Sequence, residues 1–70
     1  MKLVENLKKL RKERHITQEE LSIALEISLR TYGRYESGER EPNASILWRM
    51  ADFYGVTIDY LVGRTDSKGM

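Results

Sequence analysis

The sequence has no cysteine, a single histidine, a single proline and no long hydrophobic run. Without cysteine the chain can form neither a disulfide nor a thiolate metal site, so packing alone must hold the fold. We therefore expect no metal, no cofactor and a location in the reducing cytoplasm. No apolar run reaches the roughly 18 residues that cross a bilayer, and the charged start MKLVENLKKLRKER is unlike a signal peptide. No membrane association is expected.

Groups for catalysis are equally scarce. The sequence offers no glycine-rich phosphate loop after a strand, and its lone His15 has no cysteine to activate. The adjacent carboxylates Glu19 and Glu20 lie where a helix begins, and acids in a first turn ordinarily stabilise the positive end of the helix. We predict that the chain is not an enzyme and needs no small-molecule ligand.

The charges are nearly balanced but unevenly placed. Seventy residues with 40% hydrophobic content suit one small domain, and the net charge is only +1. An argument for nucleic-acid binding must therefore come from where the charges sit. Basic residues crowd the first segment at Lys2, Lys8, Lys9, Arg11, Lys12 and Arg14. Taken alone, that run is ordinarily a solvated helix face.

Leucines at helical spacing predict a first helix from Lys2 to about Glu13. Leu3, Leu7 and Leu10 form one stripe that faces a core. Arg11 continues the stripe, and an arginine on a buried line usually needs a carboxylate partner. Glu36 is the best candidate.

Two further helices follow, joined by a tight turn. Thr17 and Glu20 have the spacing of a capping box, so a second helix begins there, with Leu21, Ala24 and Leu25 as its buried face. Ser28 can cap a third helix from Leu29 to about Ser37. So short a connection forces the sharp crossing of a helix-turn-helix.

The third helix has two unlike sides. Tyr32, Tyr35 and Glu36 are expected to face inward, and Leu29, Arg30, Gly33, Arg34 and Ser37 outward. Two arginines on an otherwise uncharged outer face are typical of a helix that enters a DNA groove.

The remaining chain predicts two more helices. Gly38 can end the third helix in a left-handed conformation, and Asn43 can cap a fourth with Leu47, Met50, Ala51 and Tyr54 inside. Gly55 ends it, and Thr57 caps a short fifth helix that buries Ile58, Leu61 and Val62. We expect one domain over residues 1–63 and a flexible tail over 64–70.

Three segments carry a family likeness: LRKERHITQEELS, SLRTYGRYESGEREP and LWRMADFYGVTIDYLVGRTD. At this spacing the chain resembles the phage repressor and Cro type of helix-turn-helix protein, the XRE family. The resemblance implies an all-α, five-helix, lambda-repressor-like domain with its helix-turn-helix at the second and third helices. It also implies a sequence-specific transcriptional regulator, expected to be a repressor, that binds double-stranded DNA.

The resemblance also assigns roles to residues. It implies that Leu29, Arg30 and Arg34 read bases, with the recognition helix from Ser28 to Ser37 in the major groove. The predicted phosphate contacts come from Gln18, Ser28, Thr31, Ser37, Arg40 and Asn43. Arg11 and Glu36 match the buried ion pair of the family.

The chain departs from the family pattern at two bends. Glu26 and His15 stand where glycine is usual, and a glutamate forced to positive φ costs on the order of 1 kcal/mol. Either the turn differs in shape or the domain tolerates the strain.

So small a net charge allows one copy few ionic contacts with DNA. We therefore expect a homodimer on a palindromic operator with half-sites about one helical turn apart. The candidate dimer surface contains Trp48, Ile58 and Tyr60, although a tryptophan beside a core stripe also packs commonly within its own domain. The alternative function is an antitoxin-like protein-binding module that also binds its own promoter.

Overall fold

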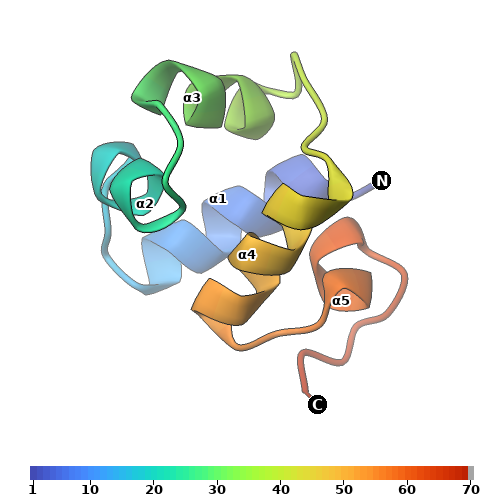
Figure 1. The fold of residues 1–70 in the computed structure, drawn as a ribbon. Helices are drawn as coiled ribbons and strands as arrows, with labels where there is room; N and C mark the ends of the chain where they lie inside the picture. Colours follow the sequence, from blue (N-terminus) through green and yellow to red (C-terminus); the bar gives the residue numbers. More distant parts are fainter. Residues whose placement is uncertain (70) are drawn as a thin grey trace.

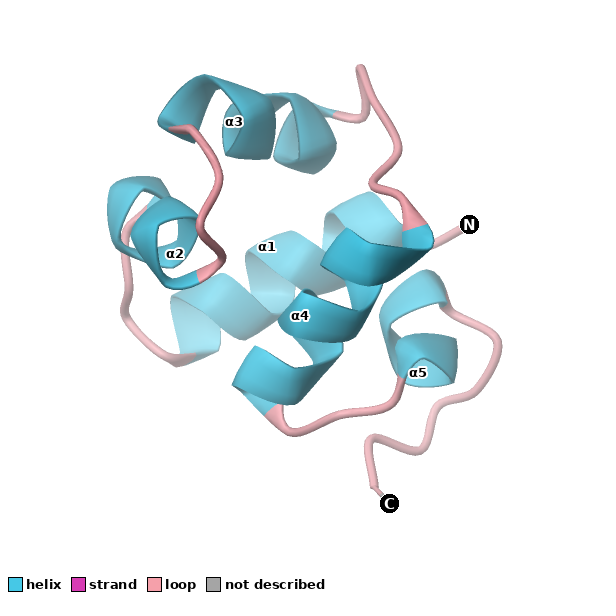
Figure 2. Cartoon of the chain, in the orientation of Figure 1, coloured by secondary structure: helices cyan, strands magenta, loops and turns pink. Residues whose placement is uncertain are grey.

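Five helices make up the regular structure of the computed structural model, which describes residues 1–69 (Figure 1). They are α1 (Leu3–Glu13), α2 (Gln18–Ala24), α3 (Leu29–Ser37), α4 (Ala44–Tyr54) and α5 (Ile58–Val62). Residues 1–69 contain no strand, and loops connect the helices (Figure 2). The predicted all-α, five-helix fold is confirmed. Met70, the last residue of the predicted tail, lies outside the described residues.

Polar side chains fix where four of the helices begin. The Thr17 hydroxyl accepts a hydrogen bond from the Glu20 N–H at 3.0 Å, and the Glu20 carboxylate accepts one from the Thr17 N–H at 2.9 Å. Ser28, Asn43 and Thr57 each accept a bond from the backbone N–H three residues later. Because each cap satisfies a donor that has no partner within the helix, these starts are set locally, as the sequence predicted.

The core lies where the inner faces of the five helices meet. Helix α1 packs against α3 and α5, α2 packs against α3, and α4 packs against α5. Fully or nearly buried apolar side chains come from every helix and from the turns after α2 and α4: Leu3, Leu7, Leu10, Leu21, Leu25, Tyr32, Tyr35, Ile46, Met50, Ala51, Tyr54, Val56, Tyr60 and Leu61. Each large aliphatic side chain buried in this way contributes about 1.5–3 kcal/mol. The α3 helix is left along one edge of the molecule, away from α5 (Figure 1).

The inner face of α2 differs from the prediction at one residue. Ala24 is exposed and lines a hollow with Glu26, Arg49 and Phe53, so its expected burial is wrong. Ser22 is buried in its place, with 2% of its surface exposed. Its hydroxyl donates to the Glu19 carbonyl at 2.7 Å, which removes the usual cost of burying a polar group.

Arg14, the residue after α1, and Arg49 of α4 contact the ends of other helices. Arg14 donates to the Tyr54 carbonyl at 2.8 Å, and Arg49 donates to the Leu25 carbonyl at 3.1 Å. These carbonyls lie at the C-terminal ends of α4 and α2, where the helix dipole favours a positive charge. The Asn6 amide bonds the Tyr60 and Leu61 carbonyls at 2.9 and 3.0 Å, which joins α1 to α5.

Part of the tail folds back on the domain. The Arg64 N–H donates to the Asp59 carbonyl at 2.8 Å, and the Lys68 ammonium lies 3.4 Å from the Glu13 carboxylate and near the Tyr60 ring. That last ion pair is exposed on both sides, so it contributes little to stability. Flexibility of residues 64–70 stays a prediction.

Both bends that lack glycine adopt a left-handed backbone. His15 has a φ of 56° and Glu26 a φ of 59°, a region in which a side chain crowds the following carbonyl. The sequence left two possibilities open, a turn of different shape or a strained residue that the domain tolerates. The structure shows the second. At Glu26 this conformation directs the chain from α2 into α3.

Replacing Glu26 by glycine is expected to stabilise the domain by about 0.5–1 kcal/mol. Relief of left-handed strain, about 1–2 kcal/mol, outweighs the extra freedom of glycine in the unfolded chain, about 0.4–1 kcal/mol. For a chain of this size, thermal unfolding followed by circular dichroism should show a midpoint a few degrees higher. Glu26→Ala removes the same carboxylate but keeps Cβ, so it is the matched control. A glycine variant no more stable than the alanine variant would contradict the strain.

Candidate nucleic-acid interface

The outer face of α3 is the candidate surface for a nucleic acid. Tyr32, Tyr35 and Glu36 are buried, whereas Leu29 and Arg30 are exposed, as predicted. The helix is short and its inner side is packed into the core, so its outer side chains stand on a rigid support. A Cβ added to Gly33 would meet no heavy atom within 4 Å, so the fold itself does not require glycine there.

The two arginines of this face differ in whether they have an ion-pair partner. Arg30 is exposed and has no ion-pair partner within residues 1–69. The Arg34 side chain is 41% exposed, and its Nε lies 3.7 Å from the Glu39 carboxylate. This pair is long and solvated, so a phosphate or a base can displace it at little cost.

The predicted phosphate contacts retain different numbers of free donors. The Ser28 hydroxyl donates to the Thr31 hydroxyl at 2.9 Å, which leaves the Thr31 proton available. The Ser37 hydroxyl donates to the Arg34 carbonyl at 3.1 Å. Asn43 uses only its carbonyl oxygen as a cap, at 2.9 Å from the Ile46 nitrogen, so its amide N–H groups are left to donate. The Arg40 side chain is exposed beyond the end of α3.

Arg11 and Glu36 form a bidentate ion pair beneath this face. Arg11 Nε donates to Glu36 Oε2 at 2.8 Å and Nη2 donates to Oε1 at 3.0 Å, while Nη1 donates to the Ile16 carbonyl at 3.0 Å. Glu36 is only 3% exposed. Burial alone would raise the pKa of Glu36, but the hydrogen bonds from its partners, Arg11 foremost, lower that pKa below its ordinary value.

The tyrosines around this pair stay neutral at physiological pH. Burial raises the pKa of Tyr54 to about 12 and raises that of Tyr32 further. Arg11 and Glu36 are therefore the charges that matter in this part of the core.

Gln18 joins the ion pair from the first residue of α2. Its Nε2 donates to Glu36 Oε1 at 3.1 Å, and the side chain is half-buried. This contact was not predicted. Residues 18 and 36 are far apart in the sequence, and the local pattern around each residue gives no indication of the other. One of the two Gln18 amide protons is held inside, and the other is left to donate.

The predicted dimer surface is correct in its exposure at two of three residues. Trp48 is 66% exposed and Ile58 is 38% exposed, but Tyr60 is only 6% exposed. The exposure of Ile58 agrees with a place on the surface and contradicts its expected burial on the inner face of α5. The expectation that Tyr60 lies on the surface is wrong, because it is on the side of α5 that packs toward α1 and Lys68 lies near its ring.

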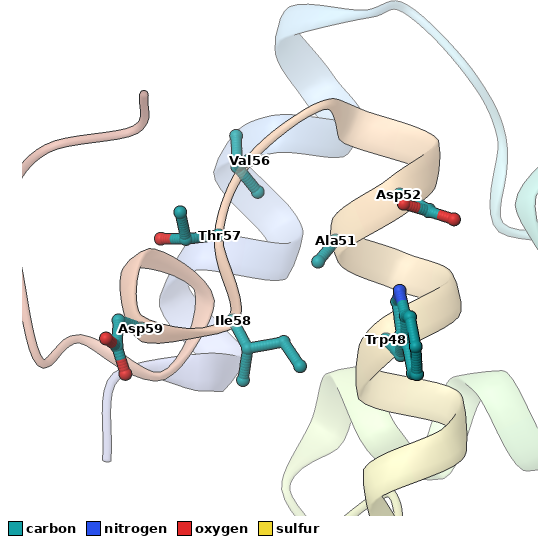
Figure 3. A pocket seen from close by; sticks show the side chains of 7 residues that line it. All are labelled: Trp48, Ala51, Asp52, Val56, Thr57, Ile58 and Asp59. Carbon is teal, nitrogen blue, oxygen red and sulfur yellow. The ribbon is translucent and has the colours of Figure 1, made fainter. Parts of the chain in front are cut away.

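A shallow apolar hollow lies beside Trp48, between α4 and the start of α5. Ala51 and Ile58 face one another across it, and Trp48 stands at its rim (Figure 3). The remaining lining residues are Asp52, Val56, Thr57 and Asp59. Within residues 1–69 there is no cluster of histidine and carboxylate side chains that could hold a metal ion. None of the helices described there has the length and apolar character that crossing a membrane requires.

A family model described as "Helix-turn-helix" matches residues 7–61, which include all of α2, α3 and α4. The chain belongs to the helix-turn-helix family. The resemblance found in the sequence is thereby confirmed, and the α2 and α3 pair is the motif that gives the family its name.

Relatives in this family are named as regulators of transcription. The chain is 38% identical over 65 residues to an uncharacterized HTH-type transcriptional regulator, YqaE, of Bacillus subtilis. The matched stretch covers 91% of this chain and 56% of the relative. It is 41% identical over 64 residues to the cryptic phage CTXphi transcriptional repressor RstR of Vibrio cholerae, which covers 91% of this chain and 57% of that repressor.

A solved structure shares the fold. The crystal structure of a transcriptional regulator from Listeria innocua superposes with a TM-score of 0.84 at 34% identity, over 93% of this chain and 61% of that one. The chain thus spans a little more than half the length of the relatives it matches.

Proposed function

We propose that this chain binds double-stranded DNA in a sequence-specific manner and regulates transcription, acting as a repressor in the cytoplasm. The observation that carries the proposal is the pair Arg30 and Arg34, presented outward from a helix whose opposite side is locked into the core. Membership in the helix-turn-helix family and relatives named as transcriptional regulators support it.

The recognition helix, Ser28 to Ser37, has the diameter to enter the major groove, where each base pair presents a distinct set of donors and acceptors. The guanidinium fork of arginine donates to O6 and N7 of guanine together, so Arg30 and Arg34 are assigned to guanines. Leu29 has no polar group and is assigned to a thymine methyl. These contacts determine sequence preference.

Contacts to phosphates hold this helix in register without reading sequence. We assign them to Gln18, Ser28, Thr31, Ser37, Arg40 and Asn43. Of these, Arg40 contributes a full positive charge, and Thr31 and Asn43 have donors that the fold leaves available. A single copy therefore has few charged contacts, and its affinity is correspondingly small.

Two copies are proposed to act together on a palindromic operator. Trp48 and Ile58 present exposed apolar surface beside the hollow between α4 and α5 (Figure 3), and burying it against a second copy would form a two-fold interface. Linking two modules raises affinity without new contacts to each half-site.

Selection of bound duplexes from a random DNA pool tests the whole proposal. The expected product is a palindrome with guanine in each half-site and with half-site centres about 10 base pairs apart. A chain with Trp48→Ser, measured in parallel by sedimentation and by operator titration, should be monomeric and bind more weakly. A pool that shows no enrichment at physiological salt would contradict sequence-specific binding, and an enriched but single half-site would contradict the dimer.

A further inference from the structure

We propose that Glu36 is a positioning residue for DNA binding: it holds the carboxamide of Gln18 so that one of its N–H groups faces the DNA backbone. This inference rests on the proposed function. It adds a second role to Glu36 beyond the ion pair with Arg11.

The contacts form a continuous chain from the loop before α2 to the outer surface. The Ile16 carbonyl accepts a hydrogen bond from Arg11 Nη1 at 3.0 Å. The same guanidinium donates to both carboxylate oxygens of Glu36, at 2.8 and 3.0 Å. Glu36 Oε1 in turn accepts from Gln18 Nε2 at 3.1 Å. Each group has its orientation set by the one before it, and Gln18 is the last member.

The charge state of Glu36 decides which way the Gln18 amide points. An ionised carboxylate only accepts hydrogen bonds, so it selects the orientation in which the nitrogen of Gln18 faces the core. With one proton bound by Glu36, the second proton on the same nitrogen remains to donate. A phosphate oxygen accepts only, so that remaining proton is the group it needs.

Preorganisation is the physical benefit. Glutamine is a long side chain with much rotamer freedom, and fixing it costs entropy whenever it binds. Because Glu36 fixes Gln18 within the folded domain, the rotamer entropy of Gln18 is lost on folding and not on binding to DNA. Removing Glu36 should therefore weaken the contribution of Gln18, even if Gln18 itself is unchanged.

A double-mutant cycle separates this role from a purely structural one. The full chain is compared with Gln18→Ala in two backgrounds: the native core, and an apolar core with Arg11→Met and Glu36→Leu, which leaves no unpaired charge. Operator affinity is titrated for all four proteins after circular dichroism confirms that they fold. We expect Gln18→Ala to weaken binding about tenfold in the native core, as loss of one hydrogen bond to a charged group implies, and less than about threefold in the apolar core. Equal losses in both backgrounds would overturn the proposal.

A measurement on the unmodified chain keeps the test independent of the apolar core. In a heteronuclear NMR spectrum, one side-chain amide proton of Gln18 should be shifted away from the ordinary position of a free glutamine amide and should exchange slowly with water. Two protons at the ordinary positions that both exchange rapidly would overturn the positioning role. The outcomes also distinguish the two proposals, because a chain that selects no DNA sequence fails the proposed function, whereas a chain that selects an operator with additive losses fails only the role of Glu36.

Discussion

Alanine at Arg30 or at Arg34 is expected to weaken operator binding by about 10- to 100-fold each. A bidentate contact from arginine to guanine is worth about 1–3 kcal/mol of discrimination, and truncation to alanine removes the entire fork. Binding to a scrambled duplex should change far less, because non-specific affinity depends on total positive charge. Titration of both duplexes at one salt concentration gives the ratio that measures discrimination.

Two controls separate base reading from charge. Arg30→Lys and Arg34→Lys keep the charge but lose the planar fork, so they should keep non-specific affinity and lose discrimination. Arg64→Ala removes the same charge from a side chain that is 78% exposed beyond α5, and it should change operator affinity by less than about threefold. If the alanine variants at 30 and 34 weakened operator and scrambled DNA equally, these residues would not read bases.

Arg11→Ala is expected to be the most destabilising single change in the domain. It would leave Glu36 ionised and buried without its main partner, at a cost of about 3–5 kcal/mol. A 70-residue domain has a total stability of about 4–10 kcal/mol, so the variant would be largely unfolded or close to it. Urea denaturation followed by tryptophan fluorescence and circular dichroism measures the loss.

The paired substitution Arg11→Met with Glu36→Leu is the control for that loss. Replacing both charges by apolar groups of similar size is often neutral, so the double variant should recover most of the stability. Its pH response should differ as well. Because the folded pKa of Glu36 lies below its ordinary value of 4.5, its contribution is present above pH 4.5 and is lost as the pH falls through the folded pKa. The double variant should lack this part of the acid sensitivity, and one as unstable as Arg11→Ala would refute the account.

The helix bounds were predictable because they depend on neighbouring residues. Thr17, Ser28, Asn43 and Thr57 cap the backbone three residues away, so their effect is visible in a short stretch of sequence. The bend at Glu26 was indicated only by the resemblance, as a position where the family usually has glycine, and the left-handed backbone there was one of two possibilities.

Burial was less predictable for residues that flank the apolar stripe of a helix, because either side of the stripe can face the core. Ala24 and Ser22 flank the stripe of Leu21 and Leu25, and hydrophobicity alone favoured the alanine. The structure buries the serine because its hydroxyl finds an acceptor within its own helix. Tyr60 was misplaced for a related reason, since a helix of five residues is too short for its pattern to define one inner face.

Contacts between distant segments could not be read from the sequence. The bond from Gln18 to Glu36 spans 18 positions, and the bond from Arg14 to the Tyr54 carbonyl spans 40. Each requires the packed positions of two helices, which no local pattern supplies. The pair of Arg11 and Glu36 was an exception, because an arginine on a buried stripe requires an acid somewhere.

Three arginines with acceptors inside the protein have a consequence for how this module would distinguish its operator from other DNA. Arg14 and Arg49 donate to carbonyls at helix ends and Arg11 donates to Glu36, so these charges are tied to the fold. With only Arg30, Arg34 and Arg40 assigned as cationic contacts, few cations would be displaced from the DNA when a copy binds, and the attraction common to all sequences would be small. Such a protein would be held only briefly at unrelated sites along a chromosome, and its occupancy of the operator would depend mainly on the few base pairs that α3 can read.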